Sequence, residues 1–108
     1  MSAITTHILD TSIGQPARNV AVALSDANGD VIGRGQTDPE GRCRDLLNEP
    51  LRAGRYRMSF DVADYFLARG IHSFYPVVHI DFEVFDPDQH YHVPLLISPF
   101  GYSTYRGS

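Results

Sequence analysis

The histidines are the residues of this chain whose types and spacing point most directly to chemistry. Two of the five, His90 and His92, flank a single tyrosine. In an extended strand their imidazoles project from one face, about 7 Å apart along it, and so face the same solvent or cleft. His7 lies in another strand-like segment, in which Ile4 and Ile8 belong to the opposite face. All three rings are therefore expected to point away from the core.

Three interpretations of these histidines compete. His7 and His92 could form an acid/base pair for hydrolysis, because imidazole has the side-chain pKa nearest neutrality, with an arginine holding an anionic substrate. His7, His90 and His92 could instead bind zinc, since a His-x-His strand with a third histidine resembles the ligands of His-only zinc sites. In the third interpretation they are solvated surface residues. Residue types and spacing alone leave all three open.

The end of the chain offers further polar groups. Tyr105, Arg106, Gly107 and Ser108 follow a strand-like segment that alternates polar and aromatic residues. An arginine guanidinium is a planar fork that fits an oxyanion or the edge of a planar heterocycle. A solvated tail is the alternative, because chain ends are usually frayed.

The elements that must position these residues are predicted to be short strands. Apolar and polar residues alternate, between turn signals, over 4–9, 20–24, 31–37, 56–60, 77–85, 90–97 and 102–106. We expect the first two segments to pair with each other and the last two to form a hairpin. One short helix is expected over 62–69, where apolar residues recur at spacings of three and four and Gly70 follows as a stop. The pattern predicts an all-β sandwich of two sheets, with seven or eight strands and one short α-helix.

Length and composition exclude several classes of protein. At 108 residues the chain has room for a single domain, 1–108, and too little interior for both a core and a deep cavity, so a site should be a surface groove or an interface. The net charge is −4 and every basic residue is arginine, so neither nucleic acid binding nor lysine Schiff-base chemistry is expected. The single cysteine, Cys43, cannot form an intrachain disulfide. No apolar run suggests a membrane span or a secretory leader, and we expect a cytoplasmic protein.

The last segment, 91–108, resembles the signature of the transthyretin-related 5-hydroxyisourate hydrolases. It reads YHVPLLISPFGYSTYRGS. Further matches are HILD at 7–10, the glycine and arginine at 41–42, and DYF at 64–66. The resemblance therefore covers essentially the whole chain, whereas the residues after Arg42, including Cys43 and Arg44, look variable.

The resemblance implies a fold, an activity and an assembly. The fold would be that of transthyretin, and the reaction the hydrolysis of 5-hydroxyisourate to 2-oxo-4-hydroxy-4-carboxy-5-ureidoimidazoline in urate catabolism, without a metal or cofactor. The assembly would be a homotetramer, a dimer of dimers with its sites at the subunit interface. The implied catalytic residues are His7, Arg42, His92 and Ser108, and the implied substrate-binding residues are His7, Arg42, Tyr105, Arg106, Gly107 and Ser108. The alternative function is a non-catalytic module of the same fold that binds or transports a small ligand.

The mechanism expected from these residues is general-base hydrolysis. His7 and His92 would orient and deprotonate a water that attacks the ring amide carbonyl, while Arg42 would lower the histidine pKa and stabilise the oxyanion. The sequence does not distinguish which histidine is the base, or whether Ser108 acts through its hydroxyl or a terminal carboxylate.

Overall fold

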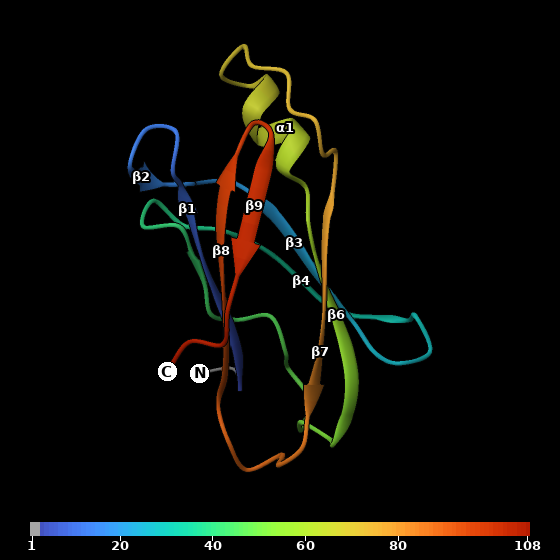
Figure 1. Cartoon of the computed structure of the whole chain (residues 1–108). Helices are drawn as coiled ribbons and strands as arrows, with labels where there is room; N and C mark the ends of the chain where they lie inside the picture. The colour runs from blue at the N-terminus through green and yellow to red at the C-terminus, as the bar shows by residue number, and fades with distance from the viewer. Residues whose placement is uncertain (1–2) are drawn as a thin grey trace.

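Two β-sheets packed face to face form the body of the protein (Figure 1). The structure, a computed structural model, describes residues 3–108. One sheet has the order β2-β1-β8-β9, with β5 also paired to β1, and contains β1 (Ile4–Asp10), β2 (Gln15–Pro16), β5 (Arg42–Cys43), β8 (Tyr91–Ser98) and β9 (Gly101–Thr104). The other has the order β4-β3-β6-β7 and contains β3 (Ala21–Ser25), β4 (Val31–Gln36), β6 (Gly54–Phe60) and β7 (Val78–Val84). The predicted sandwich is confirmed; within residues 3–108 it has more strands than expected, because β2 and β5 are too short to show an alternating pattern.

The expected pairing of 4–9 with 20–24 is wrong. Strands β1 and β3 lie in different sheets: β3 pairs with β4 and β6, whereas β1 pairs with β8 in parallel. Alternation predicts that a segment is a strand but does not predict its partner. The last hairpin is also shorter than expected, because β9 ends at Thr104; beyond it, a single antiparallel bridge between Gly107 and His92 continues the register of β9 along β8.

The predicted helix is confirmed as α1 (Val62–Leu67), which lies at one end of the sandwich (Figure 1). It buries Val62 and Phe66. A buried carboxylate, Asp10 at the end of β1, fixes the region around this helix, because it accepts hydrogen bonds from the Tyr65 hydroxyl at 2.8 Å and Arg69 Nη1 at 2.7 Å. Burial raises the pKa of Tyr65 to about 12. Within the described residues no helix is long and apolar enough to cross a membrane.

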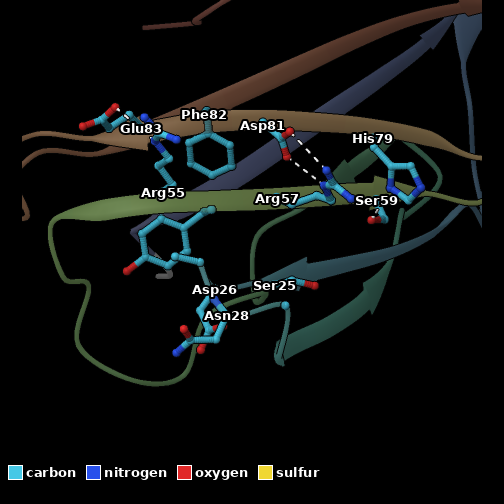
Figure 2. A pocket seen from close by; sticks show the side chains of 13 residues that line it. Ser25, Asp26, Asn28, Arg55, Arg57, Ser59, His79, Asp81, Phe82 and Glu83 are labelled. Carbon is cyan, nitrogen blue, oxygen red and sulfur yellow. Dashed lines mark hydrogen bonds and ion pairs between the residues drawn. The ribbon is translucent and has the colours of Figure 1, made fainter.

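The outer face of the second sheet carries a row of paired polar side chains across β6 and β7 (Figure 2). Arg57 binds Asp81 through two hydrogen bonds, of 2.8 and 3.2 Å. Next to this pair, Ser59 Oγ lies 2.9 Å from His79 Nδ1. Directly opposed residues of antiparallel strands are close enough to interact in this way. This face is therefore polar, and its charges largely neutralise one another.

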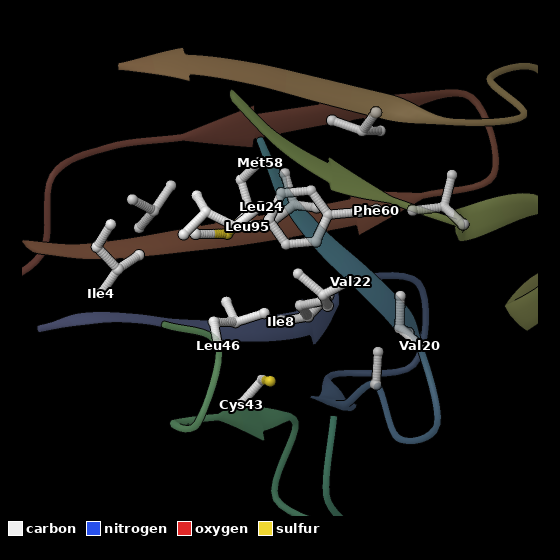
Figure 3. Packing of buried hydrophobic residues seen from close by; sticks show 14 of the residues in the cluster. Ile4, Ile8, Val20, Val22, Leu24, Cys43, Leu46, Met58, Phe60 and Leu95 are labelled. Atoms are coloured by element: carbon white, nitrogen blue, oxygen red, sulfur yellow. The ribbon is translucent and has the colours of Figure 1, made fainter. Parts of the chain in front are cut away.

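The core lies between the two sheets (Figure 3). Ile4 and Ile8 of β1 and Leu95 of β8 have no exposed surface, as the alternation predicts, and they pack in one cluster with Phe60 of β6. Cys43 is a free thiol in the same cluster, and burial raises its pKa. The opposite faces of β1 and β8 are consequently left to carry polar side chains.

Candidate active site

A pocket opens on the face of the first sheet that points away from the core, above β1, β5 and β8. Its volume is about 280 Å³. It is lined by Thr5, Thr6, Arg42, Arg44, His90, His92 and Ser108. The strand register explains the grouping, because Thr5 of β1 is paired with His92 of β8, and His7 of β1 is paired with Arg42 of β5. Three of the four predicted catalytic residues, Arg42, His92 and Ser108, thus line one pocket.

His7 lies at the edge of this group, directly opposite Arg42. Its Nε2 is 2.9 Å from the carbonyl oxygen of Glu40. Because a carbonyl only accepts, Nε2 must carry the hydrogen, and Nδ1 is the nitrogen with a lone pair when the ring is neutral. His7 is therefore oriented by the loop before β5.

His92 is half-buried, and its ring is held by a hydroxyl. Its Nδ1 lies 2.8 Å from Thr5 Oγ1. Burial is the main cause that lowers the pKa of His92, followed by the positive charge of His7, His90 and Arg42, while a hydrogen bond with the Thr5 backbone acts in the opposite direction. The expectation that Arg42 lowers a histidine pKa agrees with this direction, but burial contributes more. A lowered pKa favours the neutral imidazole, the form that can accept a proton.

The tail after β9 lies against His92. The Gly107 amide donates to the His92 carbonyl at 2.9 Å. A Cβ at position 107 would stand only 2.5 Å from His92 Cδ2, so a larger residue could not take this place without moving the ring or the tail. This close approach brings Ser108 to the pocket.

Arg106 and Tyr105 do not line this pocket. The Arg106 guanidinium lies over the Tyr91 ring, 4.5 Å from its centroid, and donates to Gln89 Oε1 at 3.1 Å. Tyr105 is 61% exposed. In this arrangement Arg106 attaches the tail to β8, and substrate binding by both residues stays a prediction.

Four residues that line the pocket are not among the predicted site residues: Thr5, Thr6, Arg44 and His90. Thr5 shares a strand face with His7, so alternation carries a signal for Thr5. Arg44 belongs to the stretch after Arg42 that looks variable. His90 is predicted only as a possible zinc ligand, from its spacing to His92.

The three histidines considered for zinc are not gathered around one point. His90 Nε2 and His92 Nδ1 both contact Thr5 Oγ1, each at 2.8 Å. Among residues 3–108, no group of three or more His, Cys, Asp or Glu side chains is arranged so that it could hold a metal ion.

A larger hollow, of about 760 Å³, lies on the outer face of the second sheet beside the row of paired side chains (Figure 2). Its lining includes Arg57 and Asp81, which bind each other, and residues of the turn between β3 and β4 such as Asp26 and Asn28. The main charged groups here already have partners.

The chain is similar over its whole length to proteins of one family. A profile of the HIUase/Transthyretin family matches residues 4–107. The 5-hydroxyisourate hydrolase of Caulobacter vibrioides is 48% identical over 115 residues, which cover 100% of each chain. The structure of Klebsiella pneumoniae 5-hydroxyisourate hydrolase superposes with a TM-score of 0.89 at 41% identity, covering 97% of this chain and 98% of that one. Sea bream transthyretin in complex with thyroxine superposes with a TM-score of 0.90 at 34% identity, covering 98% of this chain and 95% of that one. The chain therefore belongs to the HIUase/transthyretin family.

Proposed function

We propose that this protein hydrolyses 5-hydroxyisourate in urate catabolism. The observation that carries the proposal is the gathering of Arg42, His92 and Ser108 around one pocket, with His7 opposite Arg42. Relatives that match the whole chain are 5-hydroxyisourate hydrolases. The protein is thus a hydrolase that acts on a cyclic amide.

The proposed reaction is the attack of water on a ring amide. A histidine, His7 or His92, accepts a proton from the water, and the water oxygen bonds to the carbonyl carbon. Arg42 donates to the carbonyl oxygen as it becomes negative. The carbon–nitrogen bond then breaks, and the leaving nitrogen takes the proton back from the imidazolium, so the ring opens to a carboxylic acid without any other reactant.

The two arginines of the pocket suit an anionic or carbonyl-rich ring. Arg42 makes one long ion pair with Glu40, at 3.9 Å, and both side chains are well exposed. Within residues 3–108 no side-chain hydrogen bond or close ion pair holds the Arg44 guanidinium; its positive charge acts on the Asp38 carboxylate from a longer distance and can also attract a ligand. Ser108 lines the pocket, and we assign it the orientation of the substrate or the water; Tyr105 and Arg106 are proposed as further substrate contacts.

The working form of the enzyme is proposed to be a homotetramer, a dimer of dimers with its sites at subunit interfaces. In the described part of the chain, β7 and β9 each end a sheet and pair on one side only, and open edges of this kind can pair with another copy. Exposed aromatic rings lie in β9 or directly before it, among them Tyr102 and Phe100, which are 43% and 76% exposed. Light scattering should give the mass of four chains, and a fully active monomer would contradict the assembly.

A cytoplasmic location completes the proposal. The one cysteine of the chain, Cys43, is a buried free thiol, as is usual in compartments that keep thiols reduced. Cell fractionation with a marker for each compartment tests this location.

An ultraviolet assay with freshly generated 5-hydroxyisourate tests the activity. The expected result is catalytic loss of the substrate absorbance, faster than its spontaneous decay, in the presence of a chelator as well as in its absence. Saturable binding without substrate loss would instead indicate a non-catalytic binding or transport module.

A further inference from the structure

One threonine hydroxyl joins two histidines at the edge of the pocket. Thr5 Oγ1 lies 2.8 Å from His92 Nδ1 and 2.8 Å from His90 Nε2. Thr5 is almost fully buried, with 6% of its surface exposed, His92 is half-buried and His90 is exposed. The hydroxyl therefore connects the shielded ring to a ring that meets solvent.

The hydrogen count of this arrangement restricts the two rings. A hydroxyl has one hydrogen, so Thr5 can donate to only one of the two nitrogens and must accept from the other. With both rings neutral, either His92 carries its hydrogen on Nδ1 and His90 accepts at Nε2, or His90 donates from Nε2 and His92 accepts at Nδ1. In the first arrangement His92 Nε2 has a free lone pair, and in the second it carries a hydrogen.

The charges around the pocket favour the first arrangement. Arg42 and Arg44 line the pocket together with His92, and a lone pair is more stable near positive guanidinium groups than an N–H dipole is. His90 can accept this arrangement at low cost, because its remaining hydrogen, on Nδ1, belongs to a ring that is exposed to solvent.

We propose that Thr5 and His90 are positioning residues that hold neutral His92 with its hydrogen on Nδ1, so that Nε2 is free to accept the proton of the attacking water. This inference rests on the proposed hydrolase function and refines it, because it assigns the general base to His92. His7 donates its Nε2 hydrogen to the Glu40 carbonyl and does not line the pocket that His92 lines, so we assign it the orientation of the water. In the proton-transfer step, His92 Nε2 gains the proton of the water while Nδ1 keeps its own, and the resulting imidazolium still donates to Thr5.

The tautomer can be measured without substrate. Long-range ¹H–¹⁵N correlation spectra of the ¹⁵N-histidine-labelled protein, recorded where His92 is neutral, distinguish a hydrogen on Nδ1 from one on Nε2. We expect the Nδ1–H form for His92 in the unmodified protein and a shift towards the Nε2–H form in Thr5→Val. A wild-type spectrum with the hydrogen on Nε2 would overturn the proposal.

Kinetics test the consequence for the reaction. Thr5→Val keeps the side-chain shape but removes the hydroxyl, and kcat should fall about 10- to 100-fold, part of what a general base contributes, with KM changed less than about twofold. Thr5→Ser should restore kcat. His90→Phe should act like Thr5→Val, because Thr5 is then free to donate to His92 Nδ1 and so to favour the wrong tautomer.

The outer face supplies a matched control. Ser59 and His79 form a hydroxyl–imidazole contact of 2.9 Å outside the pocket, so Ser59→Ala should keep the wild-type kcat. Wild-type kcat in both folded Thr5→Val and His90→Phe would overturn the proposal; if circular dichroism shows that Thr5→Val does not fold, the exposed His90→Phe decides alone. A wild-type protein that does not hydrolyse 5-hydroxyisourate would refute the proposed function instead, and the NMR result would still show whether Thr5 sets the tautomer.

Discussion

The two hollows of this molecule differ less in the residues they contain than in how those residues are paired. Both contain arginine, histidine and a hydroxyl, and the hollow on the outer sheet is the larger, at about 760 against about 280 Å³. On the outer sheet Arg57 is bound by Asp81, whereas in the smaller pocket Arg44 faces the same space as His92 without such a partner. Size is therefore a poor guide to the active site, and polar groups that converge without neutralising each other are a better one.

Substituting a histidine on each face should produce the largest difference in hydrolysis rate between the two faces. His92→Asn removes a proposed proton acceptor, and hydrolysis should fall by about 10²- to 10⁴-fold, the usual contribution of a general base. His7→Asn should also fold and hydrolyse poorly. His79→Asn, on the outer face, should hydrolyse at the wild-type rate in the same ultraviolet assay. Normal turnover in both His7→Asn and His92→Asn would refute the proposed mechanism.

A substitution in the tail should reduce activity nearly as much as the histidine substitutions do. In Gly107→Ala the new Cβ would meet His92 Cδ2 at 2.5 Å, so the ring or the tail must move, and we expect kcat/KM to fall about 10- to 100-fold, as small misplacements of catalytic groups commonly cause. The control is Gly101→Ala, whose Cβ would meet nothing closer than Ser98 Oγ at 3.8 Å. Equal activity of the two variants would show that the tail does not position the site.

Substituting one arginine on each face should affect substrate binding on the pocket side only. Arg44→Gln removes a guanidinium that no side-chain hydrogen bond or close ion pair holds in the described residues, and KM should rise about tenfold, the value of one charge-assisted hydrogen bond of about 1.5 kcal/mol. Arg55→Gln removes an exposed arginine on the outer face, 3.9 Å from Glu83, and should leave KM unchanged. A KM that responds equally to both changes would indicate only a general effect of net charge.

The smallest of these expected differences between the two faces is their response to acid. The pKa of His92 lies below the ordinary value of 6.5, mainly because of burial, so kcat/KM should fall on the acid side with a midpoint below 6.5. On the outer face the hydrogen bonds from Arg57 lower the pKa of Asp81 below 3.8, so this pair keeps its charges, and its contribution to stability, throughout that range. Circular dichroism at each pH should therefore show a folded protein while activity is lost, and unfolding at the same midpoint would contradict this.

The sequence predicts the faces of the strands well and their neighbours poorly. The alternation of Ile4 and Ile8 with His7 correctly separates the core from the polar face, because burial acts on each residue of a strand locally. That Thr5 lies opposite His92 depends on the parallel pairing of two distant strands, which no local pattern contains. Arg44 is missed because β5 spans two residues, too few to show a period.

The tail illustrates a second limit of the sequence. The resemblance points to Tyr105, Arg106, Gly107 and Ser108 as a unit, yet they have different surroundings in the structure. Ser108 reaches the pocket, whereas Arg106 packs on Tyr91, although the bridge between Gly107 and His92 only continues the antiparallel register of β9 along β8. Which side chains of the tail reach the pocket depends on their contacts with β8, and the motif does not contain these contacts.

The parallel pairing of β1 with β8 also bears on how the protein is made. Thr5 and His92 are 87 residues apart in the chain, so the first strand leaves the ribosome long before its neighbour exists. Until then the unpaired edge of β1 is free to join other strands, and contacts between such distant segments form slowly. The active site is consequently among the last parts of the molecule to assemble, and a nascent chain interrupted before β8 would lack both His92 and the strand that covers β1.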